Sequence, residues 1–249
     1  YLQVSMTQIK EILIITCIDE TQRINYNTLI EEESNKSDIL LSSILPPTLV
    51  KRVKDGETNI SFSVQSASII FLDIISFTPW CSSNTASYVM MVLNRLYKEF
   101  DSVIHNYPSL TKVKCIGDCY MAAGGIFTEI NQPSQHARES VEFGLAAIQT
   151  VIMLDKELNE KLQIRIGINT GGPIVAGVLG SGKPTFEILG PAINLAQQME
   201  HHGIPMKVHI SRHVYELIYG GPFNIKEKGE TEVKNGTIMT YIVEELATK

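Results

Sequence analysis

Two aspartates at the ends of apolar runs are the residues of this chain best placed to do chemistry. Asp118 follows Gly117 between two runs of strand-forming residues, and such a dipeptide suits a tight hairpin turn. Asp73 lies near the end of the apolar run Ala67–Ile74. Each acid alone has an ordinary explanation, as a strand end or as a turn residue. Together, two carboxylates would form a hard-oxygen site suited to Mg²⁺.

The order of the predicted elements decides whether the two aspartates meet. The sequence predicts a buried strand, an amphipathic helix, a hairpin, a second helix and an alternating strand, over residues 64–75, 85–106, 112–125, 134 onward and 163–170. This is the βαββαβ order of the ferredoxin-like folds. In that topology the first and third strands are antiparallel neighbours. We therefore expect Asp73 and Asp118 to converge at one edge of the sheet.

The predicted fold class is α+β, an α/β sandwich with a ferredoxin-like core, an antiparallel sheet and C-terminal additions. Pro191 is expected to begin a helix that ends near His202. Shorter elements follow, over residues 207–210 and 212–219, and a hairpin ends the chain. Residues 77–83 are expected to form a loop rich in backbone donors.

Composition limits the classes of function. A chain of 249 residues that is 44% hydrophobic can bury a substantial core. Its net charge of −6 gives no reason to expect a nucleic-acid partner. The four cysteines show no C-x-x-C spacing, which favours a reducing, cytosolic setting. No apolar run reaches the roughly 20 residues that a membrane helix needs, so we expect no membrane insertion by this chain.

The first 47 residues are predicted to be a helical lead-in or linker, and residues 48–249 the main domain. Leu45-Pro46-Pro47 should end whatever precedes it, because neither proline can donate a helix hydrogen bond. The lead-in is either a surface extension or a parallel helical connector into a dimer. Because the chain begins at Tyr1 rather than Met, we expect it to be a fragment of something longer.

Four separated motifs resemble the catalytic domain of the class III nucleotidyl cyclases, the adenylate and guanylate cyclases. They are Phe71-Leu-Asp-Ile-Ile-Ser-Phe-Thr78, Lys114-Cys-Ile-Gly-Asp-Cys-Tyr-Met-Ala122, Arg165-Ile-Gly-Ile-Asn-Thr-Gly171 and Glu187-Ile-Leu-Gly-Pro-Ala-Ile-Asn194. The resemblance covers residues 40–244. It implies a head-to-tail dimer with shared active sites, in which the ribose 3′-hydroxyl attacks the α-phosphate and pyrophosphate leaves.

The resemblance also implies roles for individual residues. Asp73, Ile74 and Asp118 would bind two Mg²⁺ or Mn²⁺ ions per active site. The backbone around Phe77 and Thr78 would contact the phosphates of the substrate. Cationic contacts would come from Arg165 and Lys234, which could instead be an ordinary strand cation and a solvated surface lysine.

Two positions select the base in the family, and here they are Lys114 and Glu187. A lysine can donate to purine N1 and a carboxylate can accept from the adenine amine, so both residues favour ATP. The alternative is that Glu187 is a half-exposed strand residue paired with Lys114. Asn194 occupies the family's transition-state asparagine position. One helical turn later, where active members have arginine, this chain has the uncharged Gln198.

The leading interpretation is a homodimeric adenylate cyclase domain that converts ATP to cyclic AMP with Mg²⁺ or Mn²⁺. Gln198 motivates the alternative of a weak or inactive nucleotide-binding regulatory domain that works only in a heterodimer with a related cyclase domain. A guanylate cyclase is the third interpretation, and Lys114 disfavours it. We expect a cytosolic domain of a larger signalling protein, with or without a membrane anchor.

Overall fold

The computed structural model describes residues 1–180, 183–234 and 236–246, and this described part divides into two compact units, residues 1–56 and 57–249. The sequence placed the boundary after residue 47, whereas the structure divides after Gly56. Helix α2 (Pro47–Lys54) belongs to the first unit, and an ion pair joins its Lys54 to Asp38.

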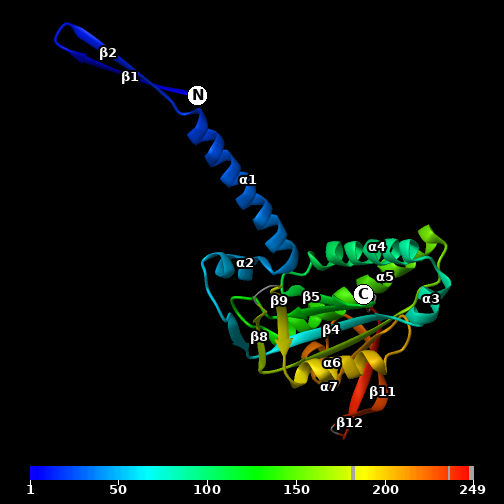
Figure 1. Ribbon diagram of the computed structural model, residues 1–249. Coiled ribbons are helices and arrows are strands. Elements are labelled where there is room, and N and C mark those ends of the chain that lie inside the picture. The colour runs from blue at the N-terminus through cyan, green and yellow to red at the C-terminus, as the bar shows by residue number, and fades with distance from the viewer. Residues whose placement is uncertain (181–182, 235, 247–249) are drawn as a thin grey trace. The chain divides into compact units, whose positions relative to one another are not determined.

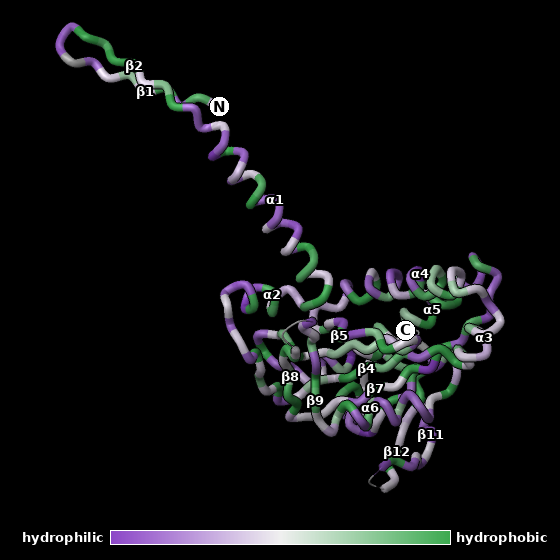
Figure 2. Tube along the Cα trace, viewed as in Figure 1, coloured by the Kyte–Doolittle hydropathy of each residue, from purple (hydrophilic) through white to green (hydrophobic). Residues whose placement is uncertain are grey.

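The first unit begins with a β-hairpin that the sequence did not predict, and a helix follows it within the predicted lead-in. Strands β1 (Leu2–Ile9) and β2 (Ile12–Asp19) pair from Leu2 opposite Asp19 to Ile9 opposite Ile12. Apolar residues alternate in β1 and β-branched residues dominate β2, a composition that favours strands over helix. Helix α1 (Thr21–Ile44) then follows. The side chains of Leu2, Met6 and Ile15 are exposed, and Figure 2 shows hydrophobic residues along both strands of the hairpin.

The second unit contains the predicted ferredoxin-like core. Within the described residues, seven strands form one sheet in the order β11-β12-β10-β7-β4-β6-β5 (Figure 1). Their bounds are β4 (Ala67–Ile74), β5 (Leu110–Ile116), β6 (Cys119–Gly124), β7 (Ile164–Gly171), β10 (Val208–Ser211), β11 (Phe223–Val233) and β12 (Gly236–Leu246). Strand β4 lies between β6 and β7 and is antiparallel to both. The predicted βαββαβ topology is confirmed.

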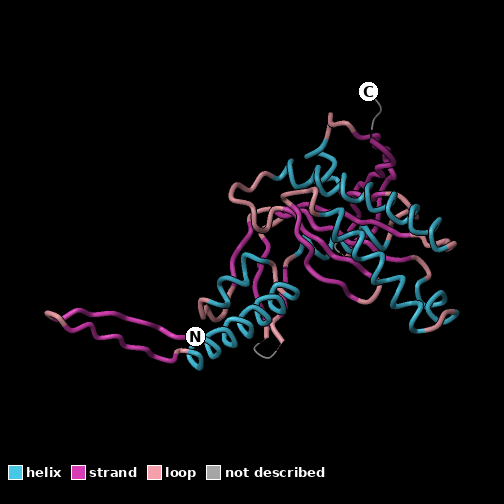
Figure 3. Tube along the Cα trace, turned by 90° about the horizontal axis from the view of Figure 1, so that it is seen from above, coloured by secondary structure: helices cyan, strands magenta, loops and turns pink. Residues whose placement is uncertain are grey.

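Helices cover both faces of this sheet (Figures 1 and 3). They are α3 (Phe77–Ser83), α4 (Ala86–Ile104), α5 (Pro133–Leu158), α6 (Pro191–His201) and α7 (Arg212–Ile218). The apolar sides of α4, α5 and α7 share one core with Ile164, Ile166 and Ile168 of β7. Gly167 points to the other face, where it lies against the backbone of α6. Strand alternation therefore places α6 opposite α4 and α5.

Residues 77–83 form a short helix rather than the predicted loop. Ser76 takes a left-handed backbone conformation (φ 55°), and α3 begins at the next residue. The predicted strand over residues 64–75 is also two strands, because residues 65 and 66 separate β3 (Ser61–Val64) from β4. Strand β3 does not pair in the main sheet and belongs to a second one.

The second sheet of the described residues pairs β3, β8 (Ile174–Leu179) and β9 (Thr185–Leu189) in the order β3-β8-β9. Val175 and Leu189 are opposite one another in β8 and β9, and each is more than half exposed, at 52% and 57%. Leu179 on β8 is 53% exposed. This sheet therefore presents an apolar surface beside Glu187. In the described ranges, no helix combines the length and the apolar character required to cross a membrane.

Candidate active site

The sheet brings Asp73 and Asp118 together, as the topology predicts. Leu72 of β4 is opposite Tyr120 of β6, so Asp73 is near the turn that contains Asp118. Burial raises the pKa of the Asp118 carboxyl, and the negative charge of Asp73 raises it further. The turn itself depends on Gly117, whose φ of 62° favours glycine. Two neighbouring carboxylates, of which Asp118 has a raised pKa, are suited to binding a cation.

A tyrosine from α4 holds the turn in place. The Tyr97 hydroxyl donates a hydrogen bond of 2.8 Å to the Gly117 carbonyl oxygen. This bond fixes the backbone immediately before Asp118. Tyr97 is not among the residues predicted from the sequence, where it is one position of an amphipathic helix without a distinguishing pattern.

The donor set at this edge fits a hard divalent cation. The Ile74 side chain is buried and has no donor atom, so only the main-chain carbonyl of this predicted metal residue could be a ligand. No group of three or more His, Cys, Asp or Glu side chains able to hold a metal is found in the described residues. Two carboxylates match Mg²⁺, which typically shares its ligands with substrate phosphates.

Arg165 lies directly beside the two carboxylates. It is opposite Asp73 in the β4–β7 register, and its Nη2 atom donates to Asp73 Oδ2 at 3.3 Å. Its Nε atom forms an ion pair of 2.9 Å with Glu200 Oε1 of α6. Arg165 is therefore a cation of the carboxylate site in this structure, and the predicted contact with the substrate phosphates stays a prediction.

Glu200 is a buried acid that the sequence argument did not single out. Its residue is 7% exposed, and burial raises the pKa of its carboxyl to about 7, with Arg165 opposing the shift. A signal did exist, because Glu200 falls on the same helical stripe as Ala196 and Met199, which are buried. An acid at a core position needs a partner, and here the partner is Arg165.

The turn before α3 exposes backbone donors close to the end of β4. Phe77 is half-buried against Trp80, with ring centroids 5.8 Å apart, and Thr78 is exposed. Both predicted residues belong to the first turn of α3, where backbone N–H groups have no intrahelical acceptor. Such groups can bind phosphate oxygens.

Glu160 anchors α3 from the other side. Its carboxylate accepts hydrogen bonds from Trp80 Nε1 at 3.1 Å and from the Tyr88 hydroxyl at 2.8 Å. These bonds connect α3, α4 and the segment that leads into β7. The position of α3 and of the turn before it therefore depends on a polar contact far along the sequence.

Lys114 and Glu187 form an ion pair with 2.6 Å between Nζ and Oε2. Their side chains are 33% and 23% exposed. The pair joins β5 to β9 and thus one sheet to the other. A register shift in β5 between Lys112 and Lys114 separates these two lysines, so Lys112 instead pairs with Asp101 of α4 at 2.8 Å. The structure therefore contains the ion pair between Lys114 and Glu187 that the sequence analysis gave as the alternative to base selection by Glu187.

Asn194 and Gln198 point away from the carboxylates of their own chain. They are four residues apart and therefore share one side of α6, where Asn194 is exposed and Gln198 half-buried. Glu200 follows Gln198 by two residues, which is about 200° around the helix, and it faces the sheet. The structure thus separates the predicted transition-state residues from the predicted metal ligands within one chain.

Lys234 is not brought to the other predicted residues. It is exposed and follows β11 at the tip of the terminal hairpin, which projects from the rest of the unit (Figure 1). Its proposed phosphate contact therefore receives no support from the geometry of a single chain.

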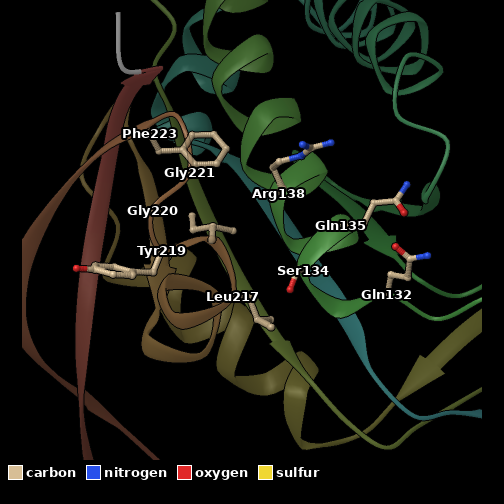
Figure 4. Close-up of a pocket in the computed structure, with 10 residues that line it drawn as sticks. Gln132, Ser134, Gln135, Arg138, Leu217, Tyr219, Gly220, Gly221 and Phe223 are labelled. Atoms are coloured by element: carbon tan, nitrogen blue, oxygen red, sulfur yellow. The ribbon is translucent and has the colours of Figure 1, made fainter. Parts of the chain in front are cut away.

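A cavity of about 520 Å³ lies elsewhere, between the start of α5 and the segment after α7 (Figure 4). It is lined by Gln132, Gln135, Arg138 and Tyr219, among others. Arg138 pairs with Glu142 at 3.7 Å. None of the predicted site residues lines this cavity, which is separate from the carboxylate site.

Comparison with known proteins identifies the family. The geometry alone defines a class, a ferredoxin-like domain with two carboxylates at one edge of its sheet. The model of the adenylate and guanylate cyclase catalytic domain matches residues 61–245. The chain therefore belongs to this family, and the resemblance of the four motifs is confirmed.

Relatives and solved structures agree with this assignment. The chain is 33% identical over 213 residues to human guanylate cyclase soluble subunit beta-2, covering 85% of this chain and 34% of that protein. It thus spans about a third of that relative's length. The catalytic core of a rhodopsin-guanylyl cyclase with converted specificity, in complex with ATPalphaS, is 33% identical, with a TM-score of 0.69 over 75% of this chain and 98% of that one.

A second solved structure is described as the non-canonical dimeric guanylyl cyclase domain of the RhoGC fusion protein from the aquatic fungus Blastocladiella emersonii. It is 29% identical to this chain, with a TM-score of 0.65, and the match covers 73% of this chain and 97% of that one. The chain is thus a nucleotidyl cyclase catalytic domain by family and by fold.

Proposed function

We propose that this domain is an adenylate cyclase that converts ATP to 3′,5′-cyclic AMP and pyrophosphate. The observation that carries the proposal is the pair formed by Lys114 and Glu187. Adenine offers an acceptor at N1 and a donor at its exocyclic amine. A lysine can only donate and an ionised glutamate can only accept, so the two side chains match the two functions of adenine.

Base binding must compete with the existing ion pair. Lys114 and Glu187 satisfy each other at 2.6 Å, and both are partly buried. An adenine between them would exchange one direct bond for two bonds to the base. A base that offered the wrong pattern would leave a charged group unpaired, which costs more than a missing contact.

Asp73 and Asp118, with the Ile74 carbonyl, are the residues that would bind two Mg²⁺ or Mn²⁺ ions. Bound divalent cations would lower the pKa of the ribose 3′-hydroxyl and neutralise charge on the triphosphate. Arg165 donates to Asp73 and so balances part of the negative charge at this edge of the sheet. The first turn of α3 offers its backbone N–H groups to phosphate oxygens.

A dimer would complete the site, because one chain keeps its parts separate. Asn194 and Gln198 lie on the side of α6 away from the buried Glu200, so they would serve the carboxylates of a second copy. The exposed Val175 and Leu189 provide an apolar surface for such an association. A solved relative with 29% identity is described as a non-canonical dimer. We therefore propose a homodimer with two equivalent sites.

The decisive experiment supplies ATP or GTP with Mn²⁺ to the purified chain and measures both cyclic nucleotides. Cyclic AMP is the expected product, and Asp73→Ala should abolish it. Asp55→Ala, in the first unit, is the matched control and should leave activity unchanged. Bound ATP without any product, over a wide range of protein concentrations, would contradict a self-sufficient enzyme.

Guanylate cyclase activity is the second candidate, and the names of the relatives favour it. Guanine reverses the pattern of adenine, with a donor at N1 and an acceptor at O6, so it would have to bind in a shifted position in which Lys114 donates to O6 and Glu187 accepts from N1. The ratio of kcat/KM for ATP and GTP separates the candidates. A ratio above about 10 supports ATP, and a ratio below 1 refutes the adenylate assignment.

Gln198 supports a third candidate, a weak domain that requires a related partner chain. Glutamine carries no charge for the developing transition state, and loss of such a contact can cost on the order of 10²–10³ in rate. Gln198→Arg should then raise kcat strongly with little change in KM. An unchanged kcat would show that the homodimer does not need this charge.

A further inference from the structure

Helix α6 carries two sets of functional residues on opposite sides. Its outward side holds Asn194 and Gln198, which the proposed dimer gives to the second active site. Its inward side holds Glu200, which reaches the carboxylate site of its own chain through Arg165. The same short helix therefore touches both active sites of a dimer.

The inward connection is a continuous chain of charges. Glu200 Oε1 lies 2.9 Å from Arg165 Nε, and Arg165 Nη2 lies 3.3 Å from Asp73 Oδ2. The side chains of all three residues are at most 26% exposed, so water screens them weakly. The guanidinium also donates to the His201 carbonyl oxygen at 3.4 Å. Arg165 is thus shared between Asp73 and the end of α6.

Helix α6 packs directly against the sheet, so a change in the contacts of Glu200 affects the position of the helix. A Cβ atom on Gly167 would lie 1.9 Å from the Glu200 backbone nitrogen. Asn169 Nδ2 donates to the Ala192 carbonyl oxygen at 3.0 Å, near the start of α6. His209 Nδ1 lies 2.6 Å from the Met199 carbonyl oxygen. Contacts near both ends of α6 therefore connect the helix directly to the sheet.

We propose that Glu200 is a positioning residue that couples the two active sites of the dimer, because it ties the outward-facing α6 to Arg165 and Asp73. The inference rests on the proposed shared-site function. While no other cation engages Asp73, Arg165 divides its charge between Asp73 and Glu200. Once a divalent cation binds Asp73, the guanidinium interacts mainly with Glu200 and the His201 carbonyl. Occupancy of one site thereby alters the helix that serves the other site.

The coupling must be reciprocal. If cation binding at Asp73 changes the state of α6, then engagement of α6 by a nucleotide in the partner's site must change cation affinity at Asp73 by the same factor. A buried ion pair is suited to this task, because removing its partner leaves an uncompensated charge.

Hydrogen exchange of residues 191–201 during a Mn²⁺ titration tests the proposal without relying on activity. In the unmodified chain, saturating Mn²⁺ should slow exchange in α6 at least threefold. Glu200→Gln should bind Mn²⁺ with an affinity within about threefold of the original and should lose the α6 response. Glu216→Gln is the matched control, because Glu216 pairs with Arg212 in a different helix. This control should keep the full response.

A second variant covers the outcome in which Glu200→Gln does not fold. Glu200→Asp keeps the charge and shortens the side chain, so it should retain a reduced response, and a thermal melt reports folding directly. The proposal is overturned if folded Glu200→Gln keeps the full Mn²⁺-dependent slowing of exchange in α6, or if Glu200→Asp shows no reduction of it. It is also overturned if the unmodified chain shows no such slowing. Failure of the proposed function is a different result, namely no cyclic nucleotide from an unmodified chain that still shows the Mn²⁺-dependent response.

Discussion

Replacing Lys114 by alanine separates a base-reading role from a purely structural one. The ion pair with Glu187 is short, at 2.6 Å, but its side chains are 33% and 23% exposed. Pairs of this exposure contribute about 0.2–1 kcal/mol to stability, so Lys114→Ala should lower the free energy of unfolding by no more than about 1 kcal/mol. Urea denaturation measures this loss.

The effect on ATP turnover should be much larger. A hydrogen bond from a charged donor to the base is worth about 1.5–3 kcal/mol. Lost in the transition state, that energy corresponds to a fall of roughly 10- to 150-fold in kcat/KM for ATP. Cyclic AMP formation under steady-state conditions measures the change. The free energy lost in catalysis should therefore exceed the free energy lost in folding.

Lys112 provides a matched control on the same strand. It pairs with Asp101 at 2.8 Å, with side-chain exposures of 36% and 38%. Lys112→Ala should lower stability by a similar amount and leave kcat/KM for ATP within about threefold. The base-reading role of Lys114 is refuted if the two variants lose the same activity, or if Lys114→Ala loses only stability.

Three further predictions follow from contacts outside the base site. Tyr97→Phe removes the hydrogen bond to the Gly117 carbonyl, so the free energy of unfolding should fall by about 1 kcal/mol. A Mn²⁺ titration should also show weaker binding, and an unchanged Mn²⁺ affinity would refute the anchoring role. Burial lowers the pKa of His136 and His209 to about 4, so the folded state binds fewer protons than the unfolded state. The free energy of unfolding should therefore fall as pH drops from about 6.5 through 4, by on the order of 2 kcal/mol for each histidine. Urea denaturation at each pH measures this loss, and a flat profile contradicts it. Leu189→Asp should weaken the dimer in sedimentation and reduce activity per mole at low concentration, and a monomeric variant with full activity would exclude a shared site.

The carboxylate site could be predicted because topology alone decides it. Once the βαββαβ order is recognised, Asp73 and Asp118 must meet, whatever side chains surround them. The contacts of Lys114 are different, because an extra residue in β5 leaves no trace in hydrophobic alternation. The pairing of Glu200 with Arg165 depends on the height and rotation of α6 over the sheet, which local sequence does not encode.

The N-terminal hairpin shows a further limit of sequence reasoning. Ile12–Ile18 is a short apolar run, and such runs are compatible with helix or strand when taken alone. Its partner strand, Leu2–Ile9, settles the question by pairing with it along its whole length. Local propensity was too weak a guide here, and a contact between neighbouring segments decided the structure.

Gly167 has a consequence for anyone who alters this domain. With a Cβ atom, this residue would meet the α6 backbone at 1.9 Å, so even alanine would force the helix to move. Because Gly167 has no side chain, α6 can approach the sheet this closely. Mutant libraries that vary substrate preference should therefore keep Gly167 unchanged. In relatives with another residue here, we expect a different spacing between the carboxylates and the residues on α6.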